Sequence, residues 1–362
     1  MKEKLSRIYT SENVLCAAQK RIALIFDEFE KIIVSISSGK DSTVLFWLAL
    51  NEAIKRNRKI RAFFLDQEAE YESSIELMEL MMSQPLVEPL WYQIPLRLTN
   101  ATSYSNSMFY CWEEDKEWLR SKHPLAIHSI IEKYPDRFYS FFNWMEKKNP
   151  DTAFLIGLRA EEGINRLKAV MLYPGCGAIR WSTRTKGKNT FRFYPIYDWG
   201  VSDIWKFIYD NGVPYNSVYD RMYHSNKNYY KTMRVSNLIH EKSFKCLGDL
   251  QIYEPEMFDR LIKRMPGVHI ASIYSKEKTV FSTDELPKGF DSWHNYKDFL
   301  LKTTPLEHKV RFEKRFSKQP KNEDMARKQV RQILINDYEN NLKIKIVKRD
   351  KNELYEKWWK EL

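Results

Sequence analysis

Residues 31–46 (KIIVSISSGKDSTVLF) join an apolar run, a turn of small residues and a helical pattern with no linker between them. The β-branched side chains of residues 32–36 predict a buried strand. This strand breaks at residues 37–39, and the helical pattern opens at Asp41. Backbone amides converge in such a turn, and the helix adds its positive N-terminal end, so the turn suits a bound anion. The stretch therefore predicts a strand, a phosphate-binding loop and a helix in succession.

The loop differs from the common Walker A phosphate loop. A Walker A motif needs Gly five positions before its Gly-Lys pair and Ser or Thr directly after the Lys. Those two positions are Val34 and Asp41 here. The sequence therefore predicts a different kind of phosphate loop.

The first 225 residues alternate between strand and helix patterns with short connections. Strands are predicted at residues 59–65, 90–96, 152–158 and 191–197. Helices are predicted at residues 11–30, 44–55 and 73–82, the last capped by Ser73 or Ser74, and a further helix is capped by Ser202 and ends near Asn211. This alternation predicts a Rossmann-like α/β fold, with a right-handed parallel sheet and helices on both faces. Ligands bind at the carboxyl ends of the strands in such sheets, where the loop and Asp66 both fall.

Two departures from this rhythm suggest the domain organisation. Residues 97–150 form an insertion rich in Trp, Tyr and Phe, which is either an additional core or a pocket wall on which bases stack. The pattern becomes mainly helical and basic from residue 226. We expect a nucleotide-binding α/β domain at residues 1–225 and a helical basic region at 226–362. Within that region we predict helices at 255–265 and 325–334, an edge strand at 342–347, and an aromatic end at Trp358-Trp359.

Charge and cysteine usage limit the class of protein. The net charge is +11, and residues 306–362 carry sixteen Lys and Arg against ten Asp and Glu. A polyanionic partner or simple solubility would each explain this balance. The four cysteines stand far apart, which argues against a disulfide framework. No segment has the length and apolarity of a membrane-spanning helix, and we expect a cytoplasmic protein with no membrane partner.

The loop resembles the PP-loop, of SxGKDS form, that marks the ATP pyrophosphatase superfamily. This superfamily includes the phosphoadenosine phosphosulfate (PAPS) reductases and the sulfate adenylyltransferase small subunit. The resemblance implies an adenine nucleotide, either ATP or PAPS or adenylylsulfate, together with Mg²⁺. Hydroxyl groups and amides of the loop can hold a pyrophosphate, Lys40 can neutralise it, and Asp41 can cap the helix or hold Mg²⁺. The loop residues that we assign to the site are Ser37, Ser38, Gly39, Lys40, Asp41 and Ser42.

A second motif follows the predicted strand at 152–158. Residues 157–166 (GLRAEEGINR) resemble the GxRxxES..R segment of PAPS reductases, with Gly163 where the family usually has Ser. Gly157 opens this motif. Arg159 and Arg166 can make forked hydrogen bonds to phosphate or sulfate. Glu162 can hold an arginine or contact a ribose hydroxyl, and Asp66 is a candidate ligand of Mg²⁺ or ribose. The simpler alternative is an ion-paired helix start on the surface.

A third motif covers residues 194–220 and looks like the P(L/I)xDWxxxDIW…PYNxxYD segment of the same family. Most of its residues suit structural roles, since Trp199 and Trp205 can pack and Asp203 can support a helix start. Tyr215 and Asn216 are candidates to line the nucleotide pocket.

The departures from the family narrow the function. Assimilatory PAPS reductases act through an ECGxH cysteine, which is missing here, and four scattered cysteines do not reproduce the set that holds an iron–sulfur cluster in other relatives. We therefore expect no such cluster, and reductase chemistry through Cys176 or Cys246 is a third-ranked reading. Several segments, including 66–71, 95–103 and 293–305, are similar to the bacterial immunoglobulin-binding regulator A proteins, which are paired with a ParB-like partner.

Two hypotheses about the function rank above the third. The first is an enzyme that cleaves the α–β bond of ATP and adenylates an acceptor, with Lys40, Asp41, Arg159 and Arg166 as catalytic residues. The second is a nucleotide-binding regulator that uses the basic C-terminal region to contact nucleic acid and acts with a ParB-like partner.

Overall fold

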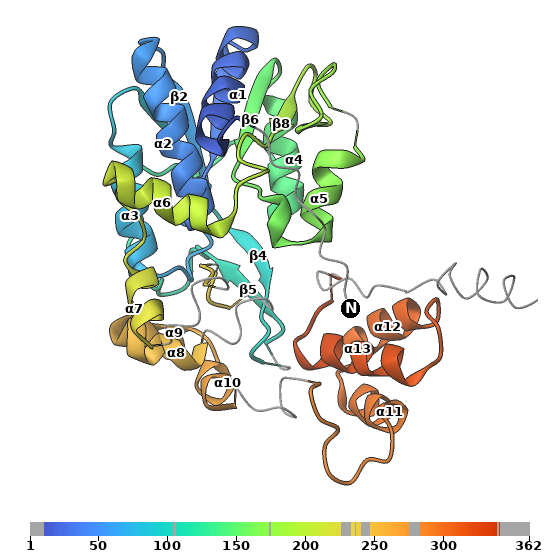
Figure 1. Cartoon of the computed structure of the whole chain (residues 1–362). Helices are drawn as coiled ribbons and strands as arrows, with labels where there is room; N and C mark the ends of the chain where they lie inside the picture. The colour runs from blue at the N-terminus through green and yellow to red at the C-terminus, as the bar shows by residue number, and fades with distance from the viewer. Residues whose placement is uncertain are drawn as a thin grey trace, which may run out of the picture. The chain divides into compact units, whose positions relative to one another are not determined.

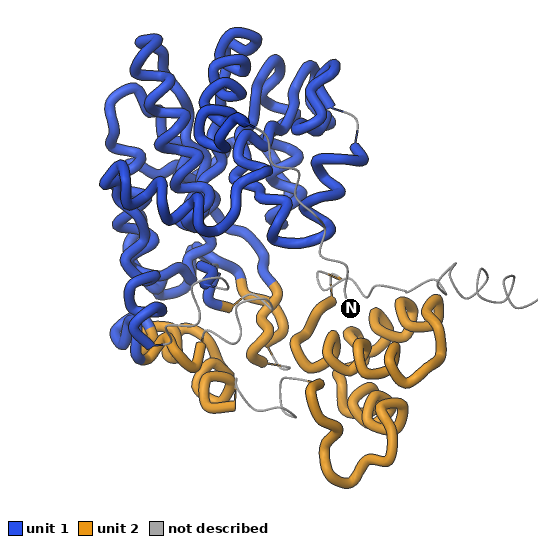
Figure 2. Tube along the Cα trace, viewed as in Figure 1, with its two compact units in different colours: residues 1–98, 110–238, 252–257 blue, residues 99–109, 239–251, 258–362 orange. Residues whose placement is uncertain are grey.

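The structure is a computed structural model that describes residues 11–103, 106–173, 175–225, 233–235, 237–239, 247–274, 283–338 and 340. The chain forms two compact units (Figure 2). Unit 1 comprises residues 1–98, 110–238 and 252–257, and unit 2 comprises residues 99–109, 239–251 and 258–362. The domain boundary expected at 225–226 stays a prediction.

Unit 1 is built on a six-stranded sheet in the order β3-β2-β1-β6-β8-β7. Its strands are β1 (Lys31–Ser35), β2 (Ile60–Leu65), β3 (Val87–Tyr92), β6 (Thr152–Ile156), β7 (Ser182–Arg184) and β8 (Phe191–Phe193). All neighbouring pairs are parallel except β7 with β8. Ser35 at the end of β1 pairs with Phe63 of β2 and with Ile156 of β6, so the carboxyl ends of the three central strands lie at one edge.

Apolar side chains alternate between the two faces of this sheet, as the period of a strand requires. On one face, Val34 and Phe64 belong to a core shared with α1 (Val14–Glu28), α2 (Lys40–Lys55), α3 (Glu72–Met82) and α6 (Val201–Asn211) (Figure 1). On the other face, Phe142 of α4 (Phe138–Lys148) packs 5.4 Å from Phe63 and 5.7 Å from Phe154, measured between ring centroids. Helices therefore cover both faces, which confirms the predicted fold class.

Several predicted boundaries are wrong, although the elements themselves exist. The third strand runs over Val87–Tyr92, and the following residues form β4 (Leu96–Thr99), which pairs with β5 (Met108–Cys111) in a separate small sheet. Helix α3 begins at Glu72 after Tyr71, so Ser73 and Ser74 lie inside its first turn and do not cap it. The predicted cap Ser202 is also wrong, because α6 begins after Gly200 and Ser202 lies inside its first turn. The end of α6 at Gly212, which has a left-handed backbone, matches the predicted end.

The aromatic insertion is mainly a core. Trp112, Phe141 and Phe142 are buried, whereas Tyr139 is exposed. Phe141 packs edge-on against Tyr92 at the end of β3, with 5.3 Å between ring centroids. Tyr104 lies outside the described residues. The packing favours the core interpretation over a stacking platform for this part of the insertion.

The motif residues assigned to packing do pack. Trp199 is buried, and its indole nitrogen donates to the carbonyl of Val14 at 3.0 Å. Asp203 supports the start of α6 by accepting a hydrogen bond from the Gly200 amide at 2.6 Å. The remaining described elements around the site are a short 3-10 turn at Ala160–Glu162, α5 (Ile164–Met171) and α7 (Val218–Ser225).

The described part of the C-terminal region is mainly helical, as expected. Its helices are α8 (Leu247–Tyr253), α9 (Pro255–Arg264), α10 (Val268–Tyr274), α11 (Trp293–Thr303), α12 (Leu306–Phe316) and α13 (Glu323–Leu334). A core within unit 2 joins α11, α12 and α13 through Leu300, Phe312 and Val330. The predicted strand at 342–347 and Trp358-Trp359 lie outside the described residues. No helix of the described ranges is long and apolar enough to cross a membrane.

Candidate functional site: the loop between β1 and α2

The predicted phosphate loop leaves the carboxyl end of β1 and ends in the first turn of α2. Gly39 is the N-cap residue of α2, and Ser38 has a left-handed backbone with φ of 54°. The hydroxyl of Ser42 accepts from the Ser37 amide at 3.2 Å and donates to the Gly39 carbonyl at 2.9 Å. These bonds fold the loop tightly over the positive end of the helix, which is the local arrangement that favours a bound anion.

Gly157 lets the neighbouring strand approach this loop. It follows β6, and a Cβ atom at this position would lie 2.8 Å from both the backbone nitrogen and the Cα of Ser42. A side chain at 157 would therefore displace the first turn of α2. The glycine that opens the second motif is required by the close contact between two backbone segments.

A chain of ion pairs brings both motifs together. The Nε of Arg159 donates to Asp41, and the other oxygen of Asp41 lies 3.4 Å from the Nζ of Lys40. The two terminal nitrogens of Arg159 lie 3.0 Å from Glu161 and 3.7 Å from Glu162. The Arg159 side chain is only 4% exposed, so its charge needs these carboxylates to offset the loss of water.

Arg166 sits differently from Arg159. Its Nε lies 3.4 Å from Glu162, while its side chain is 45% exposed. Glu162 therefore contacts both arginines, which agrees with its predicted role of holding an arginine in place. Arg159 is enclosed by carboxylates, whereas the guanidinium of Arg166 faces solvent and can approach a ligand.

Two donors of Lys40 have partners from a later part of unit 1. Its backbone amide donates to the hydroxyl of Tyr219 at 3.1 Å, and its Nζ donates to the carbonyl of Met233 at 3.2 Å. Tyr219 is buried, and burial raises the pKa of its phenol. Tyr219 was not among the predicted site residues, although the third motif contains it.

Asn216 reaches the loop through one intermediate residue. Its amide nitrogen donates to the Ser74 hydroxyl at 2.9 Å, and the Ser38 hydroxyl donates to the same oxygen at 2.9 Å. Tyr215 points its hydroxyl to Asp220 at 2.6 Å, and burial together with this hydrogen bond raises the pKa of Tyr215 to about 12. Asn216 is therefore tied to the loop, whereas the Tyr215 hydroxyl is held by Asp220.

Asp66 is fully buried at the end of β2, and donors surround both of its oxygens. One oxygen accepts from the Glu68 amide at 3.0 Å and from Arg120, while the other accepts from Trp91 at 3.0 Å and Gln93 at 2.9 Å. A metal ligand would have to exchange some of these donors for the ion. No group of three or more potential metal-ligating side chains occurs among the described residues.

The acidic turn after β2 anchors the aromatic insertion, which the sequence did not reveal. The Glu68 carboxylate accepts from the backbone amides of Trp112 at 2.7 Å and Leu119 at 3.1 Å. Glu70 is also buried, and burial, reinforced by the nearby Asp66, raises the pKa of Glu70 to about 8. The amide nitrogen of Asn237 lies 3.3 Å from Glu70.

The described cysteines have the features of ordinary thiols. Cys111 is buried, Cys176 is half-buried and Cys16 is exposed, and all three are free. Burial raises the pKa of Cys111 and of Cys176, which disfavours the reactive thiolate at neutral pH. Cys246 lies outside the described residues.

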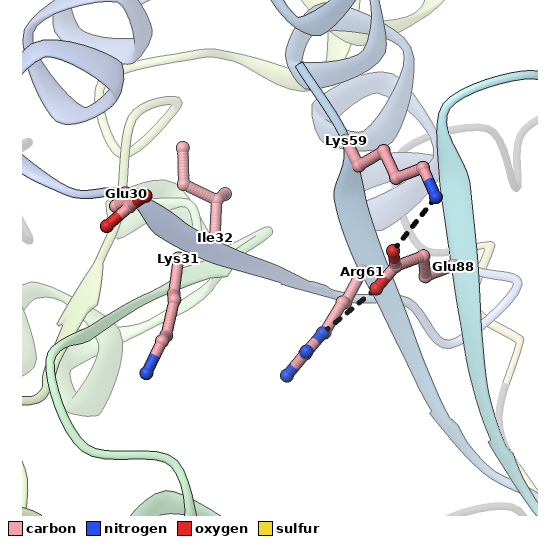
Figure 3. A pocket seen from close by; sticks show the side chains of 6 residues that line it. All are labelled: Glu30, Lys31, Ile32, Lys59, Arg61 and Glu88. Atoms are coloured by element: carbon pink, nitrogen blue, oxygen red, sulfur yellow. Dashed lines mark hydrogen bonds and ion pairs between the residues drawn. The ribbon is translucent and has the colours of Figure 1, made fainter.

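A small depression lies at the opposite end of the sheet, where the central strands begin (Figure 3). Lys31, Lys59 and Arg61 line it together with Glu88, which lies 3.4 Å from Lys59 and 3.3 Å from Arg61. Because the loop leaves the other end of β1, this depression is separate from the predicted site.

Comparisons with known proteins agree with the motif assignment. Residues 31–250 match the model of the phosphoadenosine phosphosulfate reductase domain, and residues 229–357 match a domain of unknown function (DUF3440). The chain is 28% identical over 315 residues to the uncharacterized protein YbdN of Escherichia coli K12, covering 81% of this chain and 76% of that protein. It is 26% identical over 193 residues to the uncharacterized protein MJ0973 of Methanocaldococcus jannaschii, covering 52% and 38%.

Solved structures with low overall similarity were also found. The FMN adenylyltransferase of Candida glabrata in complex with FMN and an ATP analogue has 16% identity and a TM-score of 0.36, over 59% of this chain and 63% of that chain. The PAPS reductase of Candida auris in its phosphate complex has 13% identity and a TM-score of 0.33, over 60% and 94%. The matched part is thus less than two thirds of the adenylyltransferase. The domain model alone spans more than half of the sequence, and the chain therefore belongs to the phosphoadenosine phosphosulfate reductase domain family.

Proposed function

We propose that the protein binds ATP at residues 37–42 and transfers its adenylyl group to an acceptor. In this reaction an acceptor atom forms a bond to the α-phosphorus, the bond from that phosphorus to the α–β bridging oxygen breaks, and pyrophosphate leaves with the bond's electrons. The observation that carries the proposal is the meeting of the loop, Lys40 and Arg159 at the positive end of α2. PAPS or adenylylsulfate are the alternative nucleotides for the same site.

The residues of the site would act by electrostatics and positioning. Hydroxyls and amides of residues 37–42 would hold the departing pyrophosphate, and Lys40 would offset the charge that builds on it. Arg166, being open to solvent, is the arginine that we assign to direct phosphate contact. Arg159 orients Asp41 through its hydrogen bond, and its positive charge would help to offset the charge on the pyrophosphate. Asn216 holds the loop through Ser74.

Mg²⁺ is part of the proposal, with Asp41 as its protein ligand. Mg²⁺ is commonly held by one or two carboxylates together with substrate phosphates, so a large protein ligand set is not needed. Asp41 fits because it stands at the loop with one oxygen 3.4 Å from a lysine that a phosphate can also engage. Asp66 fits less well, since four donors already surround its oxygens. The bound ion would neutralise phosphate charge.

Exchange of labelled pyrophosphate into ATP tests the proposed reaction. We expect exchange that depends on Mg²⁺ and on the correct acceptor, because the reverse reaction rebuilds ATP from the adenylylated acceptor. Binding of ATP without exchange, across a broad panel of acceptors, would contradict adenylyl transfer and leave a nucleotide-binding protein.

A second candidate function rests on the exposed cationic side chains of unit 2. Five of them lie on and beside α12 and α13, namely Arg311, Lys314, Lys318, Lys321 and Arg331, and four exposed carboxylates are interspersed with them. Such a surface would give salt-dependent binding to nucleic acid. This candidate is a cytoplasmic bacterial regulator of the immunoglobulin-binding regulator A type, acting with a ParB-like partner. A mobility-shift assay at two salt concentrations tests it, and no binding even at low salt would contradict it.

A further inference from the structure

Lys40 already gives hydrogen bonds to the chain itself from its backbone amide and from its ammonium group. The backbone amide of Lys40 lies in the first turn of α2 and donates to the Tyr219 hydroxyl at 3.1 Å. Its Nζ donates to the Met233 carbonyl at 3.2 Å. The Tyr219 hydroxyl lies close to the loop, because a Cβ atom on Gly39 would be 3.9 Å from it.

Packing directs the Tyr219 hydroxyl at this amide. The Tyr219 side chain lies on α7 and is almost fully buried, with Trp205 edge-on to its ring at 5.3 Å between centroids. The start of α7 is fixed by Asn216, whose side-chain oxygen accepts from the Val218 amide at 3.0 Å. The same Asn216 donates to Ser74, which bonds Ser38 of the loop. Tyr219 and the loop therefore belong to one hydrogen-bonded assembly within unit 1.

An amide hydrogen has one good hydrogen bond to give, so phenol and phosphate compete for it. A phosphate oxygen is a charged acceptor, and charged acceptors form stronger bonds than a neutral hydroxyl. A nucleotide can therefore displace the phenol, but the bond that it breaks subtracts from its binding free energy. The ammonium of Lys40 differs, because it carries three N–H donors and the Met233 carbonyl takes only one of them.

We propose that the Tyr219 hydroxyl is an internal competitor that holds the PP-loop in a self-bonded state, which the pyrophosphate portion of a nucleotide must displace. This inference rests on the proposed function, since it concerns the same site. It predicts a tyrosine that lowers affinity for the nucleotide, which is the opposite of a tyrosine that donates to the bound phosphate.

The test compares two tyrosines of the same helix. Tyr219 and Tyr223 both lie on α7, but Tyr219 is buried with its hydroxyl at the loop, whereas Tyr223 is 43% exposed. Tyr219→Phe removes the competing acceptor and keeps the ring, and Tyr223→Phe is the matched control. We would measure binding of inorganic pyrophosphate and of ATP to the full chain by calorimetry.

We expect Tyr219→Phe to bind both probes about two- to twelvefold more tightly, as loss of one neutral competing hydrogen bond implies. Tyr223→Phe should bind like the unaltered protein. Equal or weaker binding by Tyr219→Phe, with Tyr223→Phe unchanged, would overturn the inference alone. Absence of binding by the unaltered protein and by both variants would instead refute the proposed nucleotide site, and the inference with it.

A second measurement uses the unaltered protein, so a folding defect cannot affect it. Tyrosine nitration by tetranitromethane, read by peptide mass spectrometry, reports how accessible each phenol is. We expect pyrophosphate to increase nitration of the buried Tyr219, because the phenol ring must leave the loop to make room for the anion, and to leave the exposed Tyr223 unchanged. Nitration of Tyr219 that stays constant or falls when pyrophosphate is bound would overturn the inference.

Discussion

Arg159 and Asp41 form a buried ion pair across 118 residues of sequence. Asp41 belongs to the first turn of α2, and Arg159 follows β6. The pair therefore joins the loop to the neighbouring strand and fixes the charge of both motifs at one edge of the sheet. Removal of either partner would leave the other charge buried and uncompensated.

We predict that Arg159→Ala lowers the free energy of unfolding by about 3 kcal/mol or more, the cost of breaking a buried pair. Arg166→Ala is the matched control, because this arginine is 45% exposed and should cost less than about 1 kcal/mol. Urea unfolding of both variants measures the difference. Equal losses for the two arginines would show that burial of Arg159 does not govern its contribution.

We predict that Gly157→Ala disrupts the loop, because its Cβ would lie 2.8 Å from backbone atoms of Ser42. Overpacking of this kind costs about 1–3 kcal/mol and should also weaken ATP binding, since the first turn of α2 must move. Gly177→Ala is a useful control. Its Cβ would contact nothing within 4 Å, although the residue has φ of 53°, so it carries backbone strain only. Normal ATP binding by Gly157→Ala would argue against the close-contact explanation.

Glu70 gives a prediction for pH dependence. Its pKa is raised from 4.5 to about 8 in the folded protein, mainly by burial, so the fold favours the protonated carboxyl. The stability that this group provides is complete below pH 4.5 and is lost as the pH rises toward 8. Glu70→Gln, which keeps the neutral shape, should therefore gain stability relative to the unaltered protein across this range.

Unfolding in urea at pH 5, 7 and 9 checks the Glu70 prediction. The exposed Glu76→Gln on the same stretch of chain is the control, and its difference from the unaltered protein should not grow with pH. A stability difference for Glu70→Gln that is constant across the three pH values would contradict the assigned burial.

Glu254 caps a helix from a distant part of the sequence. Its carboxylate accepts from the amides of Glu72 at 2.7 Å and Ser73 at 3.2 Å, and from the Ser73 hydroxyl at 2.8 Å. We predict that Glu254→Ala costs about 1–2 kcal/mol, as loss of a helix cap does. Glu256→Ala, which removes an exposed carboxylate two residues away, should lose far less stability than Glu254→Ala. Thermal unfolding of both variants measures the loss of stability. Equal costs would dismiss the capping role.

These residues show what could be predicted from the sequence. The strand, loop and helix at residues 31–55 follow from local patterns, since β-branched residues, small residues and helical spacing stand next to one another. The order of the motifs predicted that Lys40, Asp41 and Arg159 belong to one site, but it did not predict that they form ion pairs with one another. The cap of α3 was assigned to Ser73 or Ser74 because a cap is normally sought next to its helix, yet Glu254 supplies it from 182 residues away in sequence.

The surroundings of Asp66 could not be predicted for the same reason. Its position after a strand was correct, but three of its four hydrogen-bond donors come from Trp91, Gln93 and Arg120, on β3 and in the segments that follow it. Each of these residues has an ordinary sequence context. Only the fold brings them to one carboxylate, so the sequence could not show that donors from distant residues surround Asp66. Tyr219 illustrates the converse, because a motif residue that suits packing also contacts the loop.

The most direct test of the central claim is calorimetric binding of ATP to Lys40→Met and Lys55→Met. Both lysines lie on α2, but Lys40 is buried at the loop, whereas the Lys55 side chain is 63% exposed at the last turn. If residues 37–42 bind the nucleotide, Lys40→Met should weaken ATP binding by about tenfold or more, the effect of losing a charge-assisted hydrogen bond. Lys55→Met should bind like the unaltered protein. ATP binding that is undiminished in Lys40→Met, or absent from the unaltered protein, would contradict the assignment of the loop as a nucleotide site.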